Sequence, residues 1–165
     1  MLSTLYWNPP IKAFTLPLIN HDVVWYGILF ALGIFLSYFV MARVILALMQ
    51  RASYKGASNL KSVAYECVDK LSLYLVLTMV LFSRLFHLVF YEQSGFFLSD
   101  PLVLFRIWEG GLASHGGVIG LFIGIVLFLK REAKHYPFLS FVTLIDLLVV
   151  PSMVTGFFIR LGNFV

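Results

Sequence analysis

A histidine stands among glycines at the start of an uncharged, strongly apolar stretch of the chain. The segment from Trp108 to Arg131 reads WEGGLASHGGVIGLFIGIVLFLKR, and its histidine is His115. An imidazole can accept a proton as a general base or donate a hydrogen bond to an anion. The surrounding glycines let a ligand or another backbone approach closely; they are Gly110, Gly111, Gly116 and Gly117.

Other polar side chains interrupt or end apolar stretches. They are Tyr26, Arg84, His87, Asp146, Arg160 and Asn163. The guanidinium group of arginine offers a planar fork of N–H donors that matches the oxygens of a phosphate. Arg84 and Arg160 could therefore bind an anion that carries phosphate.

The elements that must position these residues are predicted to be membrane helices. Hydrophobic residues make up 61% of the 165 residues and charged residues 12%, whereas a soluble domain has about 25% charged residues. Four apolar segments cover residues 23–42, 71–91, 111–129 and 138–159. Each is close to the roughly 20 residues that span a hydrocarbon core, where the backbone must bond within a helix. We expect one all-α domain over residues 1–165, a polytopic membrane bundle of four transmembrane helices.

The lysines and arginines predict how the helices are oriented. Five lie between the first two segments (Arg43, Arg51, Lys55, Lys61 and Lys70) and three between the last two (Lys130, Arg131 and Lys134). The positive-inside rule places these loops in the cytoplasm and the N-terminus outside, with Trp25 and Trp108 at the outer interface. The basic charge then marks cytoplasmic loops, and we expect no nucleic-acid partner. The lone cysteine, Cys67, is expected in the first basic loop as an unremarkable reduced thiol.

This orientation gathers polar groups near the outer leaflet. Tyr26, Arg84, His87, His115 and Arg160 all fall in helix turns next to that side, whereas Asp146 lies about 20 Å deeper than Arg160. Ionisable residues inside membranes are rare and usually functional or mutually paired. The cluster indicates a polar cavity, and a phospholipid headgroup is the obvious anion to enter it.

Each member also has a structural interpretation. Arg84 could extend to the interface or pair with Glu92, and Asp100 or Glu109 could also supply a carboxylate. Arg160 could anchor a helix end, His87 could pack, Tyr26 could belong to the aromatic belt, and Asp146 could hydrogen-bond within the bundle. Gly116, Gly120 and Gly124 form a small-residue ridge suited to close helix packing in lipid.

Four pieces of the chain, in order, resemble the bacterial prolipoprotein diacylglyceryl transferase family. They are WYG (25–27), SRLFHLVFY (83–91), DPLVLFRIWEGGLASHGGVIG (100–120) and RLGNF (160–164). The last piece is similar to the core of the family signature G-R-x-G-N-F-x-N-x-E. Ile159 replaces the signature's first glycine, and His87 stands where a tyrosine is common.

The resemblance implies a transferase of the bacterial inner membrane that acts in lipoprotein biosynthesis. Its reaction moves the sn-1,2-diacylglyceryl group of phosphatidylglycerol to the lipobox cysteine thiol of a prolipoprotein, with no metal and no cofactor. The implied catalytic residues are His115 and Arg160. Arg160 would bind the phosphate, and the other implied substrate-binding residues are Tyr26, Arg84, Gly162 and Asn163. His115 would serve as a general base or as a donor to the phosphate.

The 165 residues stop before the N-x-E end of the signature. The family also has further helices, a periplasmic head region and a second essential arginine. We therefore expect this chain to be the N-terminal portion of a longer enzyme and to lack turnover alone. Two other functions remain open: a transporter or channel fragment, in which polar residues would follow a whole path, and a structural membrane subunit without catalysis.

Overall fold

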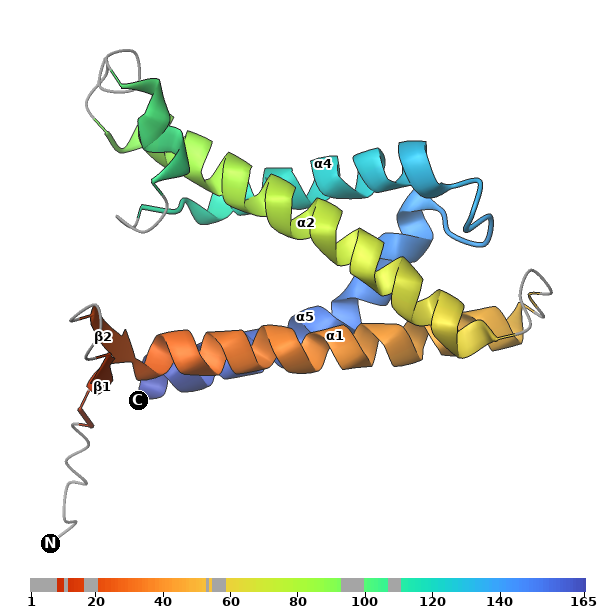
Figure 1. Cartoon of the computed structure of the whole chain (residues 1–165), viewed down its shortest axis with the longest axis horizontal. Helices are drawn as coiled ribbons and strands as arrows, with labels where there is room; N and C mark the ends of the chain where they lie inside the picture. The colour runs from red at the N-terminus through yellow and green to blue at the C-terminus, as the bar shows by residue number, and fades with distance from the viewer. Residues whose placement is uncertain are drawn as a thin grey trace, which may run out of the picture. The chain divides into compact units, whose positions relative to one another are not determined.

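The computed structural model describes residues 9–10, 12–16, 21–52, 54, 59–92, 100–106 and 111–165. Most of them lie in four long helices: α1 (Trp25–Arg51), α2 (Leu60–Phe90), α4 (Ser114–Glu132) and α5 (Phe141–Phe164) (Figure 1). All four are long and apolar enough to cross a membrane. The predicted all-α membrane fold with four spanning helices is confirmed.

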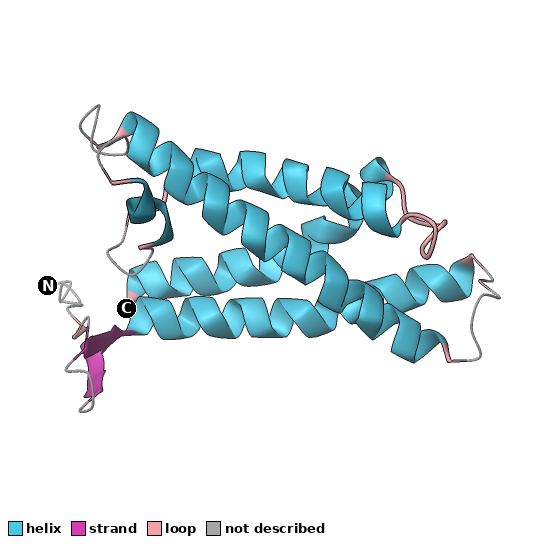
Figure 2. Cartoon of the chain, turned by 45° about the horizontal axis from the view of Figure 1, so that its top comes forward, coloured by secondary structure: helices cyan, strands magenta, loops and turns pink. Residues whose placement is uncertain are grey.

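Two smaller elements accompany the helices. Strands β1 (Lys12–Leu16) and β2 (His21–Val24) form an antiparallel hairpin directly before α1, which Figure 2 shows in magenta. A short 3-10 helix, η1 (Pro101–Phe105), begins with a proline and has Asp100 as its N-cap. Neither element was predicted, because both are shorter than the apolar segments that a hydropathy pattern detects.

The helices run past the predicted apolar segments, mainly at the basic ends. α1 continues to Arg51 instead of stopping near residue 42, and α2 begins at Leu60 instead of residue 71. Hydropathy marks the part of a helix that suits lipid, whereas backbone hydrogen bonding continues into polar sequence. Asn59 shows how α2 begins there, since its side chain accepts a hydrogen bond from the Ser62 N–H. α5 likewise extends beyond residue 159 to Phe164.

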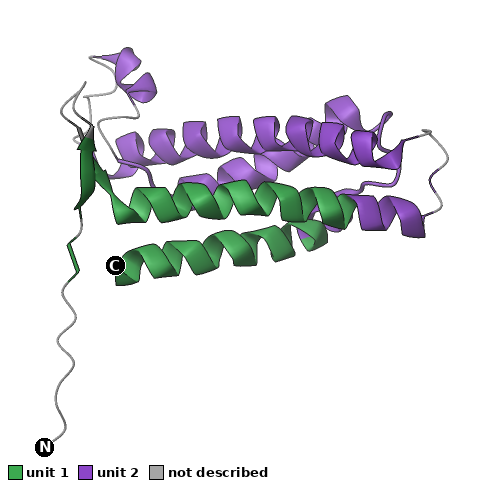
Figure 3. Ribbon diagram, turned by 60° about the horizontal axis from the view of Figure 1, so that its bottom comes forward, with its two compact units in different colours: residues 1–45, 146–165 green, residues 46–145 purple. Residues whose placement is uncertain are grey.

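The chain divides into two compact units, each of which is described by itself (Figure 3). The first comprises residues 1–45 and 146–165, and the second comprises residues 46–145. The hairpin, most of α1 and most of α5 belong to the first unit. The second unit contains α2, η1 and α4, together with the adjoining ends of α1 and α5.

In the first unit, α1 and α5 pack antiparallel through small and hydroxyl-bearing side chains. The Ser37 hydroxyl donates to the Pro151 carbonyl at 2.7 Å, so the Thr155 hydroxyl, 2.7 Å away, donates to Ser37. At Gly33, one turn earlier in α1, a Cβ would lie 2.9 Å from the Cβ of Phe158. Such close packing and interhelical hydrogen bonds are the usual means of holding helices together in lipid.

In the second unit, α2 and α4 pack antiparallel and lie side by side in Figure 1. The predicted glycine ridge of α4 faces α2, and Gly116, Gly120 and Gly124 are all buried. A Cβ on Gly120 would lie 2.5 Å from the Thr78 carbonyl oxygen, and one on Gly116 would collide with the Phe82 carbonyl. The glycines therefore allow the two backbones to touch, as predicted.

Candidate functional site

His115 lies in the first turn of α4, next to the end of α2. Its Nε2 atom is 3.2 Å from the hydroxyl of Tyr91, the residue that directly follows α2. Their ring centroids are 6.0 Å apart. α4 starts here because the chain leaves an extended Ala113, whose N–H donates to the Ser83 carbonyl of α2 at 3.0 Å. The glycines that follow then let this first turn approach α2 closely.

His87 supports this arrangement from the last turn of α2. Its ring stacks on Tyr91, with the centroids 5.5 Å apart and the planes tilted by 13°. Its Nε2 atom is 3.5 Å from a Glu92 carboxylate oxygen. This is the packing role that sequence allowed for His87. The structure places Glu92 next to His87, whereas the sequence had suggested that Glu92 could pair with Arg84.

Arg84 is almost completely buried, with 3% of its surface exposed. Its Nε and Nη2 atoms donate to the Val103 carbonyl at 3.3 and 3.1 Å, and Nη1 donates to the Gly111 carbonyl at 3.3 Å. Arg84 thus joins α2 to η1 and to the segment that leads into α4. Its predicted role in substrate binding stays a prediction, because these hydrogen bonds show a structural use of the same donors.

The hydrogen bond from Arg84 to the Gly111 carbonyl is possible because residue 111 is a glycine. It has a φ of +75°, and a Cβ there would collide with the ring of His87 and lie 2.9 Å from Nη1 of Arg84. A side chain at this position would therefore be strained and would displace both α2 residues. Of the remaining acidic candidates, Asp100 pairs with Arg106 and Glu109 lies outside the described residues.

The other predicted site residues belong to the first unit. Arg160, Gly162 and Asn163 lie in the last turns of α5, where the sequence had predicted the helix to have ended. Arg160 and Asn163 are exposed and three residues apart, so they share a face of the helix. Gly162 is buried against Tyr26, where an added Cβ would lie 3.1 Å from the Tyr26 Cα. Tyr26 is 42% exposed and stacks on Phe30.

The predicted site residues therefore form two described groups. Tyr26 and Gly162 touch within the first unit, and Gly162 lies between Arg160 and Asn163 in sequence. Arg84 and His115 lie within the second unit, where both connect α2 to the start of α4. Asp146, which sequence placed deeper in the membrane, is an exposed residue of α5.

Tyr91 was missed by the sequence analysis, although a signal was present. It follows Arg84 by seven residues and His87 by four, so helical spacing puts all three on one face. Tyr91 lies at the end of the apolar segment, where a tyrosine is easily taken for a residue of the aromatic belt.

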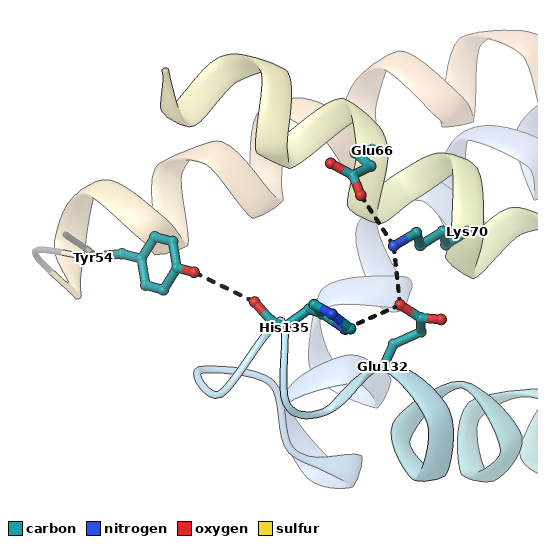
Figure 4. A network of polar contacts seen from close by, with 5 residues as sticks. All are labelled: Tyr54, Glu66, Lys70, Glu132 and His135. Atoms are coloured by element: carbon teal, nitrogen blue, oxygen red, sulfur yellow. Dashed lines mark hydrogen bonds and ion pairs between the residues drawn. The ribbon is translucent and has the colours of Figure 1, made fainter. Parts of the chain in front are cut away.

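A second polar cluster, also missed, lies at the opposite end of α2 and α4 (Figure 4). The Lys70 ammonium group is 3.0 Å from a Glu66 oxygen and 3.1 Å from a Glu132 oxygen. Glu132 is also 3.6 Å from Nδ1 of His135, and the Tyr54 hydroxyl donates to the His135 carbonyl at 3.4 Å. The network ties α2, the end of α4 and the connection after α4 together.

Buried groups surround this network. Lys70 lies 5.7 Å from the ring centre of Tyr136, and burial raises the pKa of the Tyr136 phenol to about 12. Cys67 is fully buried within α2. The prediction that Cys67 lies in a loop was wrong, because α2 continues as a helix through the basic sequence.

No cluster of three or more metal-binding side chains occurs among the described residues. An imidazole such as that of His115 can take up a proton, and a guanidinium such as that of Arg160 can bind an anion. His115 belongs to α4 and Arg160 to α5, two helices long and apolar enough to cross a membrane. Both capabilities are used in group transfer on phosphate esters.

Comparisons with known proteins point to a single family. The family model for prolipoprotein diacylglyceryl transferase matches residues 13–165. The phosphatidylglycerol–prolipoprotein diacylglyceryl transferase of Tolumonas auensis is 39% identical over 161 residues, which are 97% of this chain and 54% of that protein. The enzyme of the same name from Oleidesulfovibrio alaskensis is 37% identical over 93% of this chain and 50% of its own length.

A further relative of that name, from Protochlamydia amoebophila, is 27% identical over 99% of this chain and 64% of its own length. The chain thus spans between half and two-thirds of the length of these curated relatives.

Proposed function

Because the chain belongs to the prolipoprotein diacylglyceryl transferase family, we propose that the protein transfers diacylglyceryl groups from phosphatidylglycerol to prolipoproteins. The acceptor is the thiol of the lipobox cysteine, and the reaction is the first step of lipoprotein maturation. The observation that carries this proposal is the family match over residues 13–165, which includes every candidate site residue. The names of the relatives support the two substrates.

The reaction is a displacement at the glyceryl carbon next to a phosphate oxygen. A sulfur lone pair forms the C–S bond of a thioether, and the C–O bond to the phosphate breaks with its electron pair staying on oxygen. The thiol proton passes to a base, and glycerol phosphate leaves. A thiol of pKa about 8.5 needs only modest help to lose its proton. The leaving phosphate gains charge, so fixed cations stabilise the transition state.

The residues take roles that suit this chemistry. His115 acts on the thiol proton or donates to the phosphate, and the nearby glycines Gly111 and Gly116 hold the start of α4 close to α2. Arg160 is exposed at the end of α5, so its guanidinium is free to meet a headgroup phosphate. Tyr26, Gly162 and Asn163 line the lipid site beside Arg160. A substrate-binding role is proposed for Arg84 as well, because its guanidinium carries the positive charge that a phosphate requires.

The proposed location is the bacterial cytoplasmic membrane, with the N-terminus outside and the site facing the outer leaflet. The four apolar helices support a multi-pass membrane protein. The distribution of lysine and arginine supports the orientation. Phosphatidylglycerol would then reach Arg160 from the surrounding bilayer without leaving it.

A change at Arg160 tests the function. The assay follows transfer from labelled phosphatidylglycerol to a lipobox peptide by the full product of the reading frame that encodes this chain. Arg160→Lys keeps the charge but loses the bidentate fork. We expect transfer to fall roughly 30- to 1,000-fold, about 2–4 kcal/mol, as for a lost charge-assisted contact to the transition state.

The matched control is Arg131→Lys, which makes the same exchange at an exposed position at the end of α4. It should transfer at the wild-type rate. Absence of transfer by the unaltered product would refute the proposed function. Normal transfer by Arg160→Lys would instead reduce Arg160 to an interfacial anchor.

A further inference from the structure

One nitrogen of His115 is already engaged. The Tyr91 hydroxyl lies 3.2 Å from Nε2, which is hydrogen-bonding distance. Nδ1, the other ring nitrogen, has no hydrogen bond to another described residue. A phenolic hydroxyl can both donate and accept, so it can pair with Nε2 in either protonation state of the imidazole.

Tyr91 is well placed to hold a ring in a fixed position. Its own ring stacks on His87, and its backbone N–H donates to the His87 carbonyl at 2.9 Å. His87 in turn lies beside Glu92 and against Gly111. A tyrosine has only two side-chain torsions to fix, so ordering its hydroxyl costs little conformational entropy.

The backbone that carries His115 is fixed from the same helix. Arg84 donates to the Gly111 carbonyl, and the Ala113 N–H donates to the Ser83 carbonyl. Gly116 then touches α2 backbone one residue after His115. Because α2 supplies both the backbone supports and Tyr91, the distance between Tyr91 and His115 does not depend on a separate mobile element.

We propose that Tyr91 is a positioning residue for His115, which it orients by accepting a hydrogen bond from Nε2–H so that Nδ1 faces the reaction. This rests on the proposed function and names the atom that acts in it. The thiol proton passes to Nδ1 while Nε2–H keeps its bond to Tyr91. That bond strengthens when the ring becomes an imidazolium, since hydrogen bonds from charged donors are stronger.

The competing interpretation is that Tyr91 is an interfacial aromatic residue whose hydroxyl meets His115 without consequence. Tyr91 is 62% exposed, and tyrosines are enriched at membrane interfaces. The two interpretations differ in what removal of one hydroxyl does. Tyr91→Phe keeps the ring, its stacking on His87 and its apolar surface, and it removes only the hydrogen bond.

The first measurement does not depend on activity. The full reading-frame product is labelled with ¹⁵N in its histidine rings and studied by NMR in lipid nanodiscs. The His115 resonances are assigned by their loss in the His115→Gln variant. We expect the wild-type His115 to show Nε2 protonated and Nδ1 unprotonated, and Tyr91→Phe to move the Nε2 resonance of His115.

The matched control for this experiment is Tyr54→Phe, which also removes one hydrogen-bonding hydroxyl, at the opposite end of the second unit. It should leave both ring nitrogens of His115 unchanged. Identical His115 resonances in wild type and Tyr91→Phe would overturn the proposal, and so would a wild-type His115 protonated at Nδ1.

The second measurement is the transfer rate. Tyr91→Phe should lower kcat about 3- to 10-fold with KM unchanged, as for loss of one hydrogen bond that acts mainly on the charged form. A rise in KM with kcat unchanged would also contradict the proposal. If the wild-type product transfers nothing, the proposed function fails, and the NMR result still decides whether Tyr91 orients His115.

Discussion

At the scale of single residues, two arginines of this chain lie in opposite environments. Arg84 is buried and donates at least three N–H groups to two backbone carbonyls, whereas Arg160 is exposed at the end of α5. A buried guanidinium is tolerated only when its donors are satisfied. Arg84 is therefore important to the path of the chain between α2 and α4, whatever it contributes to substrate binding.

The proposed role of His115 as a base can be tested by substitution. His115→Gln keeps hydrogen-bonding capacity but removes the base. We expect transfer by the full reading-frame product to fall by about 100-fold or more, the usual effect of losing a general acid–base group. The readout is the rate of thioether formation on a lipobox peptide at saturating phosphatidylglycerol.

His135→Gln is the control, since His135 is exposed at the far end of the second unit. It should transfer at the wild-type rate. A His115→Gln protein that transfers normally would remove His115 from the mechanism and leave it a packing residue.

At the scale of elements, the close packing of α2 against α4 depends on glycines of α4, which have no side chain. Three glycines four residues apart present bare backbone to α2, and the Thr78 carbonyl and hydroxyl are their nearest neighbours at two of the three positions. In lipid, close van der Waals contact replaces the hydrophobic effect as the source of helix association. At the basic end, Lys70 joins Glu66 of its own helix to Glu132 of α4.

Two glycine-to-alanine substitutions distinguish the effect of helix packing on stability from the effect of helix propensity. Gly120→Ala places a Cβ 2.5 Å from the Thr78 carbonyl oxygen, and we expect it to destabilise the protein by about 1–3 kcal/mol through overpacking. Gly156 lies inside α5 with no atom within 4 Å of an added Cβ. Gly156→Ala should therefore be neutral or stabilising by up to about 1 kcal/mol, because alanine favours a helix.

The measurement is the thermal unfolding midpoint of each variant in the same detergent. Equal midpoints for Gly120→Ala and wild type would show that the two helices separate easily to admit a methyl group.

At the scale of the whole molecule, the central prediction is orientation in the membrane. The basic residues concentrate toward the end of α1, the start of α2 and the end of α4, and in the connections that follow α1 and α4. This bias predicts that both connections lie in the cytoplasm and that η1 and the starts of α1 and α4 lie outside. Under the proposed function, access of phosphatidylglycerol and of a prolipoprotein to the site depends on this arrangement.

Cysteine labelling tests the orientation. Leu102→Cys puts a thiol at a 69% exposed position of η1, and Lys134→Cys puts one at an exposed position after α4. A membrane-impermeant maleimide added to spheroplasts should label Leu102→Cys and leave Lys134→Cys unlabelled until the membrane is opened. The unaltered protein is the control, because its Cys67 is buried and should not react. The reverse labelling pattern would invert the topology and place the site on the cytoplasmic side.

The sequence by itself determined the membrane class, the number of spanning helices and the glycine ridge. These follow from hydropathy and from residue size at helical spacing, which are local properties of the chain. The ends of the helices were predicted less well, because hydropathy reports where the lipid ends and not where the helix ends. α2, for example, begins at Leu60 and includes the polar sequence around Cys67. Only the tertiary structure showed that Arg84 supports the Gly111 segment and that Tyr91 meets His115. Both contacts join residues 24 to 27 positions apart, and such contacts depend on how two helices pack rather than on any local pattern.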